Sequence, residues 1–443
     1  MISKHGRSKP HKAWHTSAWK WLVPGIGIKR WLVLLFFGVT FLALGVAYLL
    51  VNFYREQAMP PVFYYITLQF IPRLARGALF GLLGIGAFVV ALIQLNRSLL
   101  APFMRPGSEP VVETVYRHRQ RERGPKVVAI GGGTGLSTLL RGLRMYTSNI
   151  TAIVTVADDG GSSGRLRREL GVLPPGDFRN CIAALADSES LTTQLFQYRF
   201  TEGKGLDGHS FGNLFIAAMA AVTGSFESAL VESSRVLAVR GRILPSTLQN
   251  VTLMADLRQE VEGRVNRVAG ESRITESGGY IERVCLEPGD VRAYPEAIRA
   301  ILEADMIILG PGSLYTSIMP NLLVRDIAQA TRASRATKIY VCNVATQHGE
   351  TDYYSTADHV TALERHVGAG LVDAVLANDR MDVDFSAAPS GVGGMVEPSH
   401  PEGLRLVTAD LIDVEHPWRH DSRKLAQAVM DLYAQSGGRA GIN

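Results

Sequence analysis

Lys126–Leu143 has the sequence KVVAIGGGTGLSTLLRGL, and this stretch decides the fold that we expect for the chain. Lys126–Ile130 is a short β-branched run, typical of a buried parallel strand. A group of glycines follows, and from Leu136 the apolar residues recur at helical spacing. Strand, glycine turn and helix in this order place backbone N–H groups at a helix N-terminus, where an anion is favoured.

A second strand, expected over Ile150–Val156, is followed by two acidic residues and another loop of small residues. Asp158 and Asp159 lie about 25 residues beyond the glycine turn, near the spacing of a ribose-binding acid in a dinucleotide fold. The loop from Gly160 to Gly164 comes directly after them and leads into a basic segment. Two glycine-rich loops after neighbouring strands indicate a phosphate-bearing ligand.

The glycine turn alone allows other interpretations. A tight strand-to-helix turn without a ligand has the same composition. A nicotinamide fingerprint fits poorly, because Thr138 stands where a small Gly or Ala is needed. A P-loop is excluded, because no Gly-Lys-Ser/Thr closes the turn. Because the acid pair and the second glycine loop follow, we favour a turn that binds an anionic ligand over a turn that binds none.

Six short motifs, spread in order over the chain, carry a resemblance to a known family. They are GGGTG from Gly131, ADDGGSSGRLR from Ala157, PPGDFRN from Pro174, GHSFGN from Gly208, GPGSLYTS from Gly310 and TQHGETD from Thr346. In these motifs the chain resembles the gluconeogenesis factor family (YvcK type), within the superfamily of the phospholactate transferase CofD. The resemblance extends from Val127 nearly to the C-terminus. The first hundred or so residues have no counterpart in the soluble members.

The N-terminal part has the pattern of a membrane anchor. Residues 1–30 carry seven Lys/Arg and no Asp or Glu, and residues 31–53 form an uncharged apolar run of 23 residues. Such a helix is about 34 Å long, enough for a bilayer core of about 30 Å. Residues 77–95 form a second apolar run, of 19 residues. We expect two transmembrane helices rather than a buried helical hairpin. The excess of basic residues on both outer flanks places both termini and the C-terminal domain in the cytoplasm, as a multi-pass protein of the cell membrane.

Charge separates the two parts of the chain. Up to Lys126 there are 17 Lys/Arg and four Asp/Glu, a net charge of +13, whereas from Val127 onward 29 Lys/Arg and 37 Asp/Glu give −8. The pI near 9.1 therefore indicates attraction to a membrane surface, and an acidic domain makes nucleic acid a poor candidate ligand. We divide the chain into a basic cytoplasmic tail (1–30), two transmembrane helices within 31–96, a linker (97–125) and a nucleotide-binding domain (126–443) with a β-rich insertion at about 240–295.

The expected fold class is α/β, a Rossmann-like doubly wound and mostly parallel sheet with that insertion. Ligands of such sheets bind outside the strand C-termini. We expect the glycine loops to donate N–H bonds to a diphosphate, Arg179 to add a charge-assisted bond, and Asp158 or Asp159 to bind a sugar hydroxyl or Mg²⁺. Asp177 is expected to cap a helix. The candidate ligand-binding residues are Gly131, Gly132, Gly133, Thr134, Gly135, Asp158, Asp159, Gly160, Gly161, Ser162, Ser163, Arg179, Asn180, His209, Asn213, Gly310, Gly312, Ser313 and Asn343.

The resemblance implies a regulator that binds a UDP-sugar and links carbon metabolism to cell-wall synthesis and cell shape. The alternative is an enzyme like the phospholactate transferases, in which Asp159 would hold a metal or orient the attacking hydroxyl. The ADDGGSSGRLR motif and the β-rich insertion favour the regulator. The sequence implies no definite cofactor, and Mg²⁺ is the candidate metal ion. The expected partners are the nucleotide sugar, the membrane, proteins of cell-wall synthesis and a second copy of the chain.

Overall fold

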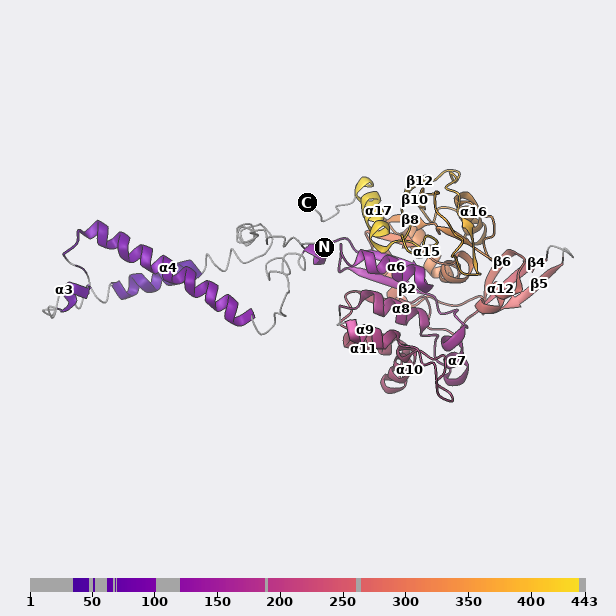
Figure 1. Ribbon diagram of the computed structural model, residues 1–443, viewed down its shortest axis with the longest axis horizontal. Coiled ribbons are helices and arrows are strands. Elements are labelled where there is room, and N and C mark those ends of the chain that lie inside the picture. The colour runs from indigo at the N-terminus through magenta and orange to yellow at the C-terminus, as the bar shows by residue number, and fades with distance from the viewer. Residues whose placement is uncertain are drawn as a thin grey trace, which may run out of the picture. The chain divides into compact units, whose positions relative to one another are not determined.

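The computed structural model describes residues 35–47, 51, 62–66, 68, 70–100, 120–187, 190–259 and 264–437. The chain divides into two compact units, Met1–Arg119 and Gln120–Asn443 (Figure 1). Each unit is described by itself below.

The N-terminal unit is helical wherever it is described at length. Residues Leu35–Ala47 are helical, and α3 (Val62–Ile66) and α4 (Arg73–Leu100) follow. Within α4, the 18 residues of Arg73–Val90 are long and apolar enough to cross a membrane, with a mean hydropathy of 1.6, and the unit buries none of them. The second predicted span, 77–95, lies within α4. The first, 31–53, is described only over the helix Leu35–Ala47 and at Val51, and its other residues lie outside the described ones. The described residues thus contain one helix of spanning length where two were predicted.

The C-terminal unit is built on a seven-stranded parallel sheet, which confirms the predicted fold class. Its strand order is β12-β10-β8-β7-β1-β2-β3, and every neighbouring pair is parallel. The strand β1 that follows Lys126 is central and fully buried, as its apolar β-branched composition predicts. The strands are β1 (Val127–Gly131), β2 (Ile150–Val154), β3 (Arg242–Pro245), β7 (Met306–Leu309), β8 (Thr337–Val341), β10 (Ala374–Asn378) and β12 (Arg405–Ala409).

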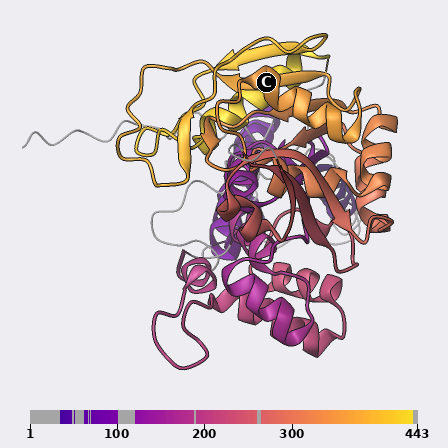
Figure 2. The same ribbon diagram turned by 90° about the vertical axis from the view of Figure 1, so that its right-hand side faces the viewer.

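Helices separate these strands along the chain. In both ribbon views, α8–α11 gather at one end of the unit and the late elements β10 and β12 at the opposite end (Figures 1 and 2). The helices are α6 (Gly133–Leu143), α7 (Gly161–Leu170), α8 (Gly176–Leu185), α9 (Ser190–Gln197), α10 (Phe211–Thr223), α11 (Phe226–Val236), α13 (Pro295–Leu302), the π-helix η2 (Leu314–Ile318), α14 (Met319–Leu322), α15 (Arg325–Ala333), α16 (Thr356–Val367) and α17 (Ser422–Gln435).

The β-rich insertion is a three-stranded antiparallel sheet that is smaller than predicted. It consists of β4 (Thr252–Arg258), β5 (Val265–Ala269) and β6 (Tyr280–Glu287), in the order β5-β4-β6, with the helix α12 (Glu271–Ser277) between β5 and β6. Within the insertion, Ser272–Thr275 lie in α12 and form no strand. The strand β3 pairs with β2 of the central sheet, so the insertion does not begin at residue 240. A two-stranded sheet pairs β9 (Ala345–Gln347) with β11 (Val392–Met395).

The C-terminal unit begins before the predicted start at residue 126. Ser148 N donates a hydrogen bond of 2.9 Å to Arg121 O. Asn149 Nδ2 donates to Glu122 O and Gly124 O, both at 2.9 Å. These bonds tie the end of the predicted linker to the turn that precedes β2. Of that linker, residues 101–119 lie outside the described residues.

Candidate functional site

Strand order places a crevice between β1 and β7. The chain runs from β1 to β2 and β3 on one side and continues through β7, β8 and β10 on the other, so the topological switch point lies between β1 and β7. Ligands of open α/β sheets bind at this point, outside the carboxyl ends of the strands. The loops that leave the two strands are Gly132–Gly135 and Gly310–Ser313, the first and third glycine loops of the sequence.

These two loops pack backbone against backbone. A Cβ added to Gly135 would lie 2.6 Å from Pro311 O, and one added to Gly312 would lie 3.2 Å from Gly132 O. Gly133 needs its glycine for another reason, since its φ is +65°. The glycines of both loops are therefore required by the close approach of the loops and by the turn into α6, before any ligand is considered.

A cavity of about 470 Å³ opens over both loops. Within it, Asn343 Oδ1 accepts a hydrogen bond from Gly312 N at 3.2 Å, and Gln347 Nε2 donates to Ser313 Oγ at 2.7 Å. These bonds hold the second loop to the chain after β8. The predicted ligand-binding residues that line the cavity are Gly133, Thr134, Gly135, Gly312, Ser313 and Asn343.

Four side chains of the cavity have a buried polar atom with no hydrogen-bond partner. These atoms are Glu271 Oε2, Gln347 Oε1, Trp418 Nε1 and His420 Nε2. Buried polar atoms in folded proteins almost always have a partner, because an unpaired one costs about 1–3 kcal/mol. Donors and acceptors that converge without partners on one cavity are suited to a polar ligand.

The protonation states of this cavity follow from burial. Burial lowers the pKa of His420 to about 4, although its other ring nitrogen is bonded to the Cys342 carbonyl. His420 is therefore neutral at pH 7, and its unpaired Nε2 is an acceptor. Burial, followed by the charges of Asp158 and Asp177, raises the pKa of Glu271 well above its ordinary value. A protonated Glu271 would donate a hydrogen bond. The cation of the cavity is the exposed Arg419.

Two predictions are wrong at Asp177: that it caps a helix, and that the N–H of Gly133 is free for a diphosphate. The residue at the N-cap of α8 is Pro175, and no side chain caps this helix. The Asp177 carboxyl instead accepts the backbone N–H of Gly133. This N–H, expected to face a diphosphate, already has a partner. Burial and then the charge of Asp158 raise the pKa of Asp177 to about 7. The Asp177 carboxyl therefore lies beside the first glycine loop, close to Gly132.

The predicted polar residues of α7, α8 and α10 form a separate cluster, which we call the Ser162 cluster. Ser162 Oγ lies 2.9 Å from His209 Nδ1 and accepts from Asn213 Nδ2 at 3.1 Å. Arg179 donates through Nη1 to Ser210 Oγ at 2.5 Å and through Nη2 to Asn180 Oδ1 at 2.8 Å. The residues of this cluster do not line the cavity of the glycine loops. Arg179 is thus not the cation beside those loops.

The acid pair also lies outside that cavity. Asp158 Oδ1 accepts from Gly160 N at 2.9 Å, and burial raises the pKa of Asp158. Asp159 Oδ1 accepts from Ser272 N at 3.0 Å, which joins the loop before α7 to α12. Gly161 and Ser163 belong to the first turn of α7, Gly131 is the last residue of β1, and Gly310 directly follows β7. Within the described ranges, no three His, Cys, Asp or Glu side chains are grouped as a metal site would need.

Thirteen residues that line the cavity were not among the predicted ligand-binding residues, and five of these have large polar or charged side chains. Trp418–His420 lie more than 280 residues after the first glycine loop, and no spacing rule connects them to it. Unpaired polar atoms become visible only when the structure is known. The five are Glu271, Gln347, Trp418, Arg419 and His420.

Comparisons of sequence and fold show which known proteins this chain resembles. The profile of the family described as "2-phospho-L-lactate transferase CofD" matches residues 127–401. The chain is 49% identical over 317 residues to the gluconeogenesis factor of Bacillus subtilis, covering 70% of this chain and 98% of that one. It is 46% identical over 453 residues to a Nostoc sp. protein that carries the same name provisionally, covering 96% and 95%. A crystal structure of a UPF0052 family member from Bacillus halodurans, 44% identical, covers 70% of this chain and 99% of its own with a TM-score of 0.65.

Proposed function

This chain belongs to the CofD family, among the gluconeogenesis factors, and we propose that its crevice between β1 and β7 binds a nucleotide sugar. The observation that carries the proposal is that four side chains lining the cavity of the glycine loops each have a buried polar atom without a hydrogen-bond partner. A nucleotide sugar offers a diphosphate, hydroxyl groups and a base, and the cavity holds a counterpart to each.

The chemistry of the lining residues assigns these counterparts. Arg419 is the cation for the diphosphate, because a guanidinium forms paired bonds to phosphate oxygens. The indole of Trp418 offers a flat apolar face and an unpaired N–H donor to a base. Glu271, Gln347 and His420 offer polar side-chain atoms to sugar hydroxyls. A cavity of about 470 Å³ lies within the range of small-molecule sites.

Titration calorimetry of the full chain in detergent, with UDP-glucose, UDP-N-acetylglucosamine, UDP and a GDP-linked sugar, tests this proposal. We expect a UDP-sugar to bind, and Arg419→Gln to weaken binding by about 10-fold or more, since a bond to a charged group contributes about 1.5–3 kcal/mol. The matched control is Arg235→Gln on α11, outside the cavity, which should bind as the wild type does. Failure of every nucleotide sugar to bind, or equal binding by Arg419→Gln, would overturn the proposal.

We further propose that the protein acts as a regulator at the inner face of the cell membrane, linking carbon metabolism to cell-wall synthesis and cell shape. The apolar helix α4 and the basic N-terminal part support membrane attachment. The full chain should sediment with vesicles that contain anionic lipid, and a fragment that begins at Gln120 should stay in the supernatant without detergent. Sedimentation of that fragment with the vesicles would contradict attachment through the N-terminal part.

The family description names a transferase, so turnover is the second candidate function. Asp159, the expected catalytic carboxylate, bonds to Ser272 N and does not line the cavity, which favours binding without turnover. If the wild-type protein transferred a phospholactyl group to a deazaflavin acceptor, it would be an enzyme and not only a binding protein.

A further inference from the structure

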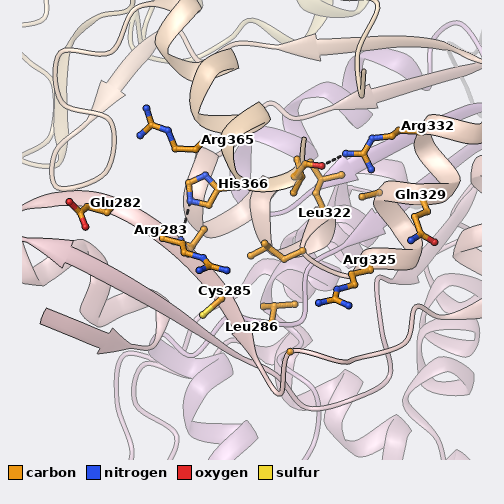
Figure 3. A pocket seen from close by; sticks show the side chains of 15 residues that line it. Glu282, Arg283, Cys285, Leu286, Leu322, Arg325, Gln329, Arg332, Arg365 and His366 are labelled. Carbon is orange, nitrogen blue, oxygen red and sulfur yellow. Dashed lines mark hydrogen bonds between the residues drawn. The ribbon is translucent and has the colours of Figure 1, made fainter. Parts of the chain in front are cut away.

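A second cavity, of about 640 Å³, lies in the C-terminal unit away from the glycine loops. It is bounded by the edge strand β6, by α14 and α15, and by the C-terminal end of α16. None of its lining residues lines the crevice between β1 and β7. Its base is apolar, with Leu286, Leu322 and Ala328 all buried. Figure 3 shows the polar side chains that stand around this base.

Four of those side chains are arginines: Arg283 from β6, Arg325 and Arg332 from α15, and Arg365 from α16 (Figure 3). One acid lines the same cavity, Glu282, and its carboxylate forms an ion pair with Arg258. The unit as a whole is acidic, with 37 Asp/Glu against 29 Lys/Arg from Val127 onward. The cavity therefore concentrates positive charge in a unit whose net charge is negative.

Three of the four arginines are not used by the fold. Arg332 is the exception, because it donates to the carbonyls of Val367, Gly368 and Ala369 and thereby caps the C-terminus of α16. Within the described part of the chain, the guanidinium groups of Arg283, Arg325 and Arg365 have neither an ion pair nor a hydrogen bond to another side chain. All three are exposed. Asp256, the residue opposite Arg283 on β4, forms its ion pair with Arg267. Like charges that line one cavity repel, and a bound anion would relieve this repulsion.

The backbone that carries these arginines is held in place. His366 Nε2 accepts the N–H of Val284 at 3.1 Å, and His366 Nδ1 lies 2.7 Å from Ala362 O. The histidine thus bonds β6 to α16 between Arg283 and Arg365. Both of its nitrogens are occupied, so it positions the arginines and is not itself a ligand for an anion.

From this geometry we propose that the cavity of Arg283, Arg325 and Arg365 is a second binding site, for a small molecule that carries two or more anionic groups. Guanidinium groups from three elements suit a ligand whose charges are separated, such as a compound with two phosphate groups. The apolar base suits the carbon skeleton between them. The site is distinct from the nucleotide-sugar crevice and has the position of an effector site.

Calorimetry with inorganic pyrophosphate as the probe tests the proposal on the full chain in detergent. Because pyrophosphate could also enter the crevice, Arg419→Gln is used as the background. In that background, pyrophosphate should still bind, and adding Arg325→Gln with Arg365→Gln should weaken binding at least 10-fold. The control pair, Arg292→Gln with Arg335→Gln, removes two exposed arginines outside both cavities and should leave binding unchanged. Citrate in place of pyrophosphate distinguishes a phosphate ligand from a polycarboxylate.

Replacing both arginines by lysine sharpens the test, because lysine keeps the charge and loses the planar fork. Affinity between the wild-type and glutamine values is expected. No pyrophosphate or citrate binding at millimolar concentration, or equal losses in the test and control pairs, would overturn the proposal. Loss of pyrophosphate binding through Arg419→Gln alone would assign the anion to the crevice instead. Since the nucleotide-sugar titration uses a different ligand and variant, either proposal can fail without the other.

Discussion

The crevice between β1 and β7 and the Ser162 cluster are made of the same kinds of residue but differ in how their polar atoms are paired. Each contains small polar side chains at the start of helices, and each lies after strands of the central sheet. In the Ser162 cluster, Ser162, Arg179, His209 and Asn213 all bond to another side chain of the cluster. In the crevice, the only polar side-chain atom of Trp418 has no partner, and Arg419 has no side-chain partner within the described residues.

The difference is that Trp418 and Arg419 of the crevice have no side-chain partner among the described residues, whereas each named side chain of the Ser162 cluster has one. Pairing in the Ser162 cluster is incomplete, since Arg179 Nε and Asn213 Oδ1 are unpartnered. Those atoms nevertheless belong to side chains that the cluster already holds in place. Four variants test whether the crevice binds the ligand and the cluster stabilises the fold.

Gly135→Val should have the largest effect. The new Cβ would lie 2.6 Å from Pro311 O and 2.8 Å from Pro311 C, so the two loops must separate. Overpacking of this kind costs about 1–3 kcal/mol, and nucleotide-sugar binding should be lost because the cavity changes shape. Calorimetry and urea unfolding measure the two effects. The control is Gly394→Val, where nothing lies within 4 Å of the added Cβ. A folded Gly135→Val variant with full affinity would remove the crevice from the ligand site.

Asp177→Asn should change the pH dependence of stability. The pKa of Asp177 is about 7 in the folded protein, above its unfolded value of about 4. Between these values the folded state holds a proton that the unfolded state has released, so stability falls as pH rises from about 4 to 7. Each unit of pKa shift corresponds to about 1.4 kcal/mol, so the fall amounts to a few kcal/mol.

Asparagine keeps an acceptor for Gly133 N–H and has no charge to bury, so the variant should lose less stability over this pH range and should exceed the wild type at pH 8. Urea unfolding of the unit that begins at Gln120, at pH 4.5, 6 and 8, measures it. Asp290→Asn, at an exposed position, is the control. Parallel pH profiles for wild type and Asp177→Asn would show that Asp177 does not carry the proton.

Ser162→Ala should have a smaller effect, on stability alone. It removes the contact with His209 Nδ1 and the acceptor of Asn213 Nδ2, which costs about 1–3 kcal/mol. Affinity for the nucleotide sugar should stay the same. Unfolding and calorimetry on one preparation provide both values, with Ser386→Ala in an exposed loop as the control. A clear loss of affinity would show that the Ser162 cluster belongs to the ligand site and does not serve the fold alone.

Asp159→Asn should have the smallest effect. Its Oδ1 can still accept the Ser272 N–H, so the change in affinity should stay within about threefold, or about 0.7 kcal/mol, and should not depend on EDTA. If Asp159 held a catalytic metal, the variant would lose the charge that hard cations require, and turnover would vanish with any Mg²⁺ dependence. Calorimetry with and without EDTA distinguishes these outcomes.

Local sequence patterns determined the elements around the crevice. The apolar run before Gly131, the glycine turn and the helical spacing from Leu136 predicted β1, its loop and α6. The same pattern at Ile150 predicted β2, and alternation of strands and helices predicted the doubly wound sheet. Such patterns suffice because a buried parallel strand and an amphipathic helix are each specified by the periodicity of neighbouring residues. The loops after β1, β7 and β8 could then be placed together, since parallel strands end at one edge of a sheet.

The tertiary structure alone decided which polar residues share a cavity. It brings Trp418–His420 to loops that precede them by more than 100 residues, turns Asp177 toward Gly133 N–H rather than the end of its own helix, and sets the Ser162 cluster apart. It also gathers four arginines from β6, α15 and α16 around a second cavity. Sequence spacing does not contain these relations, because a side chain at a loop can satisfy its hydrogen bonds in several directions. The partner is determined by the packing of segments that are distant along the chain.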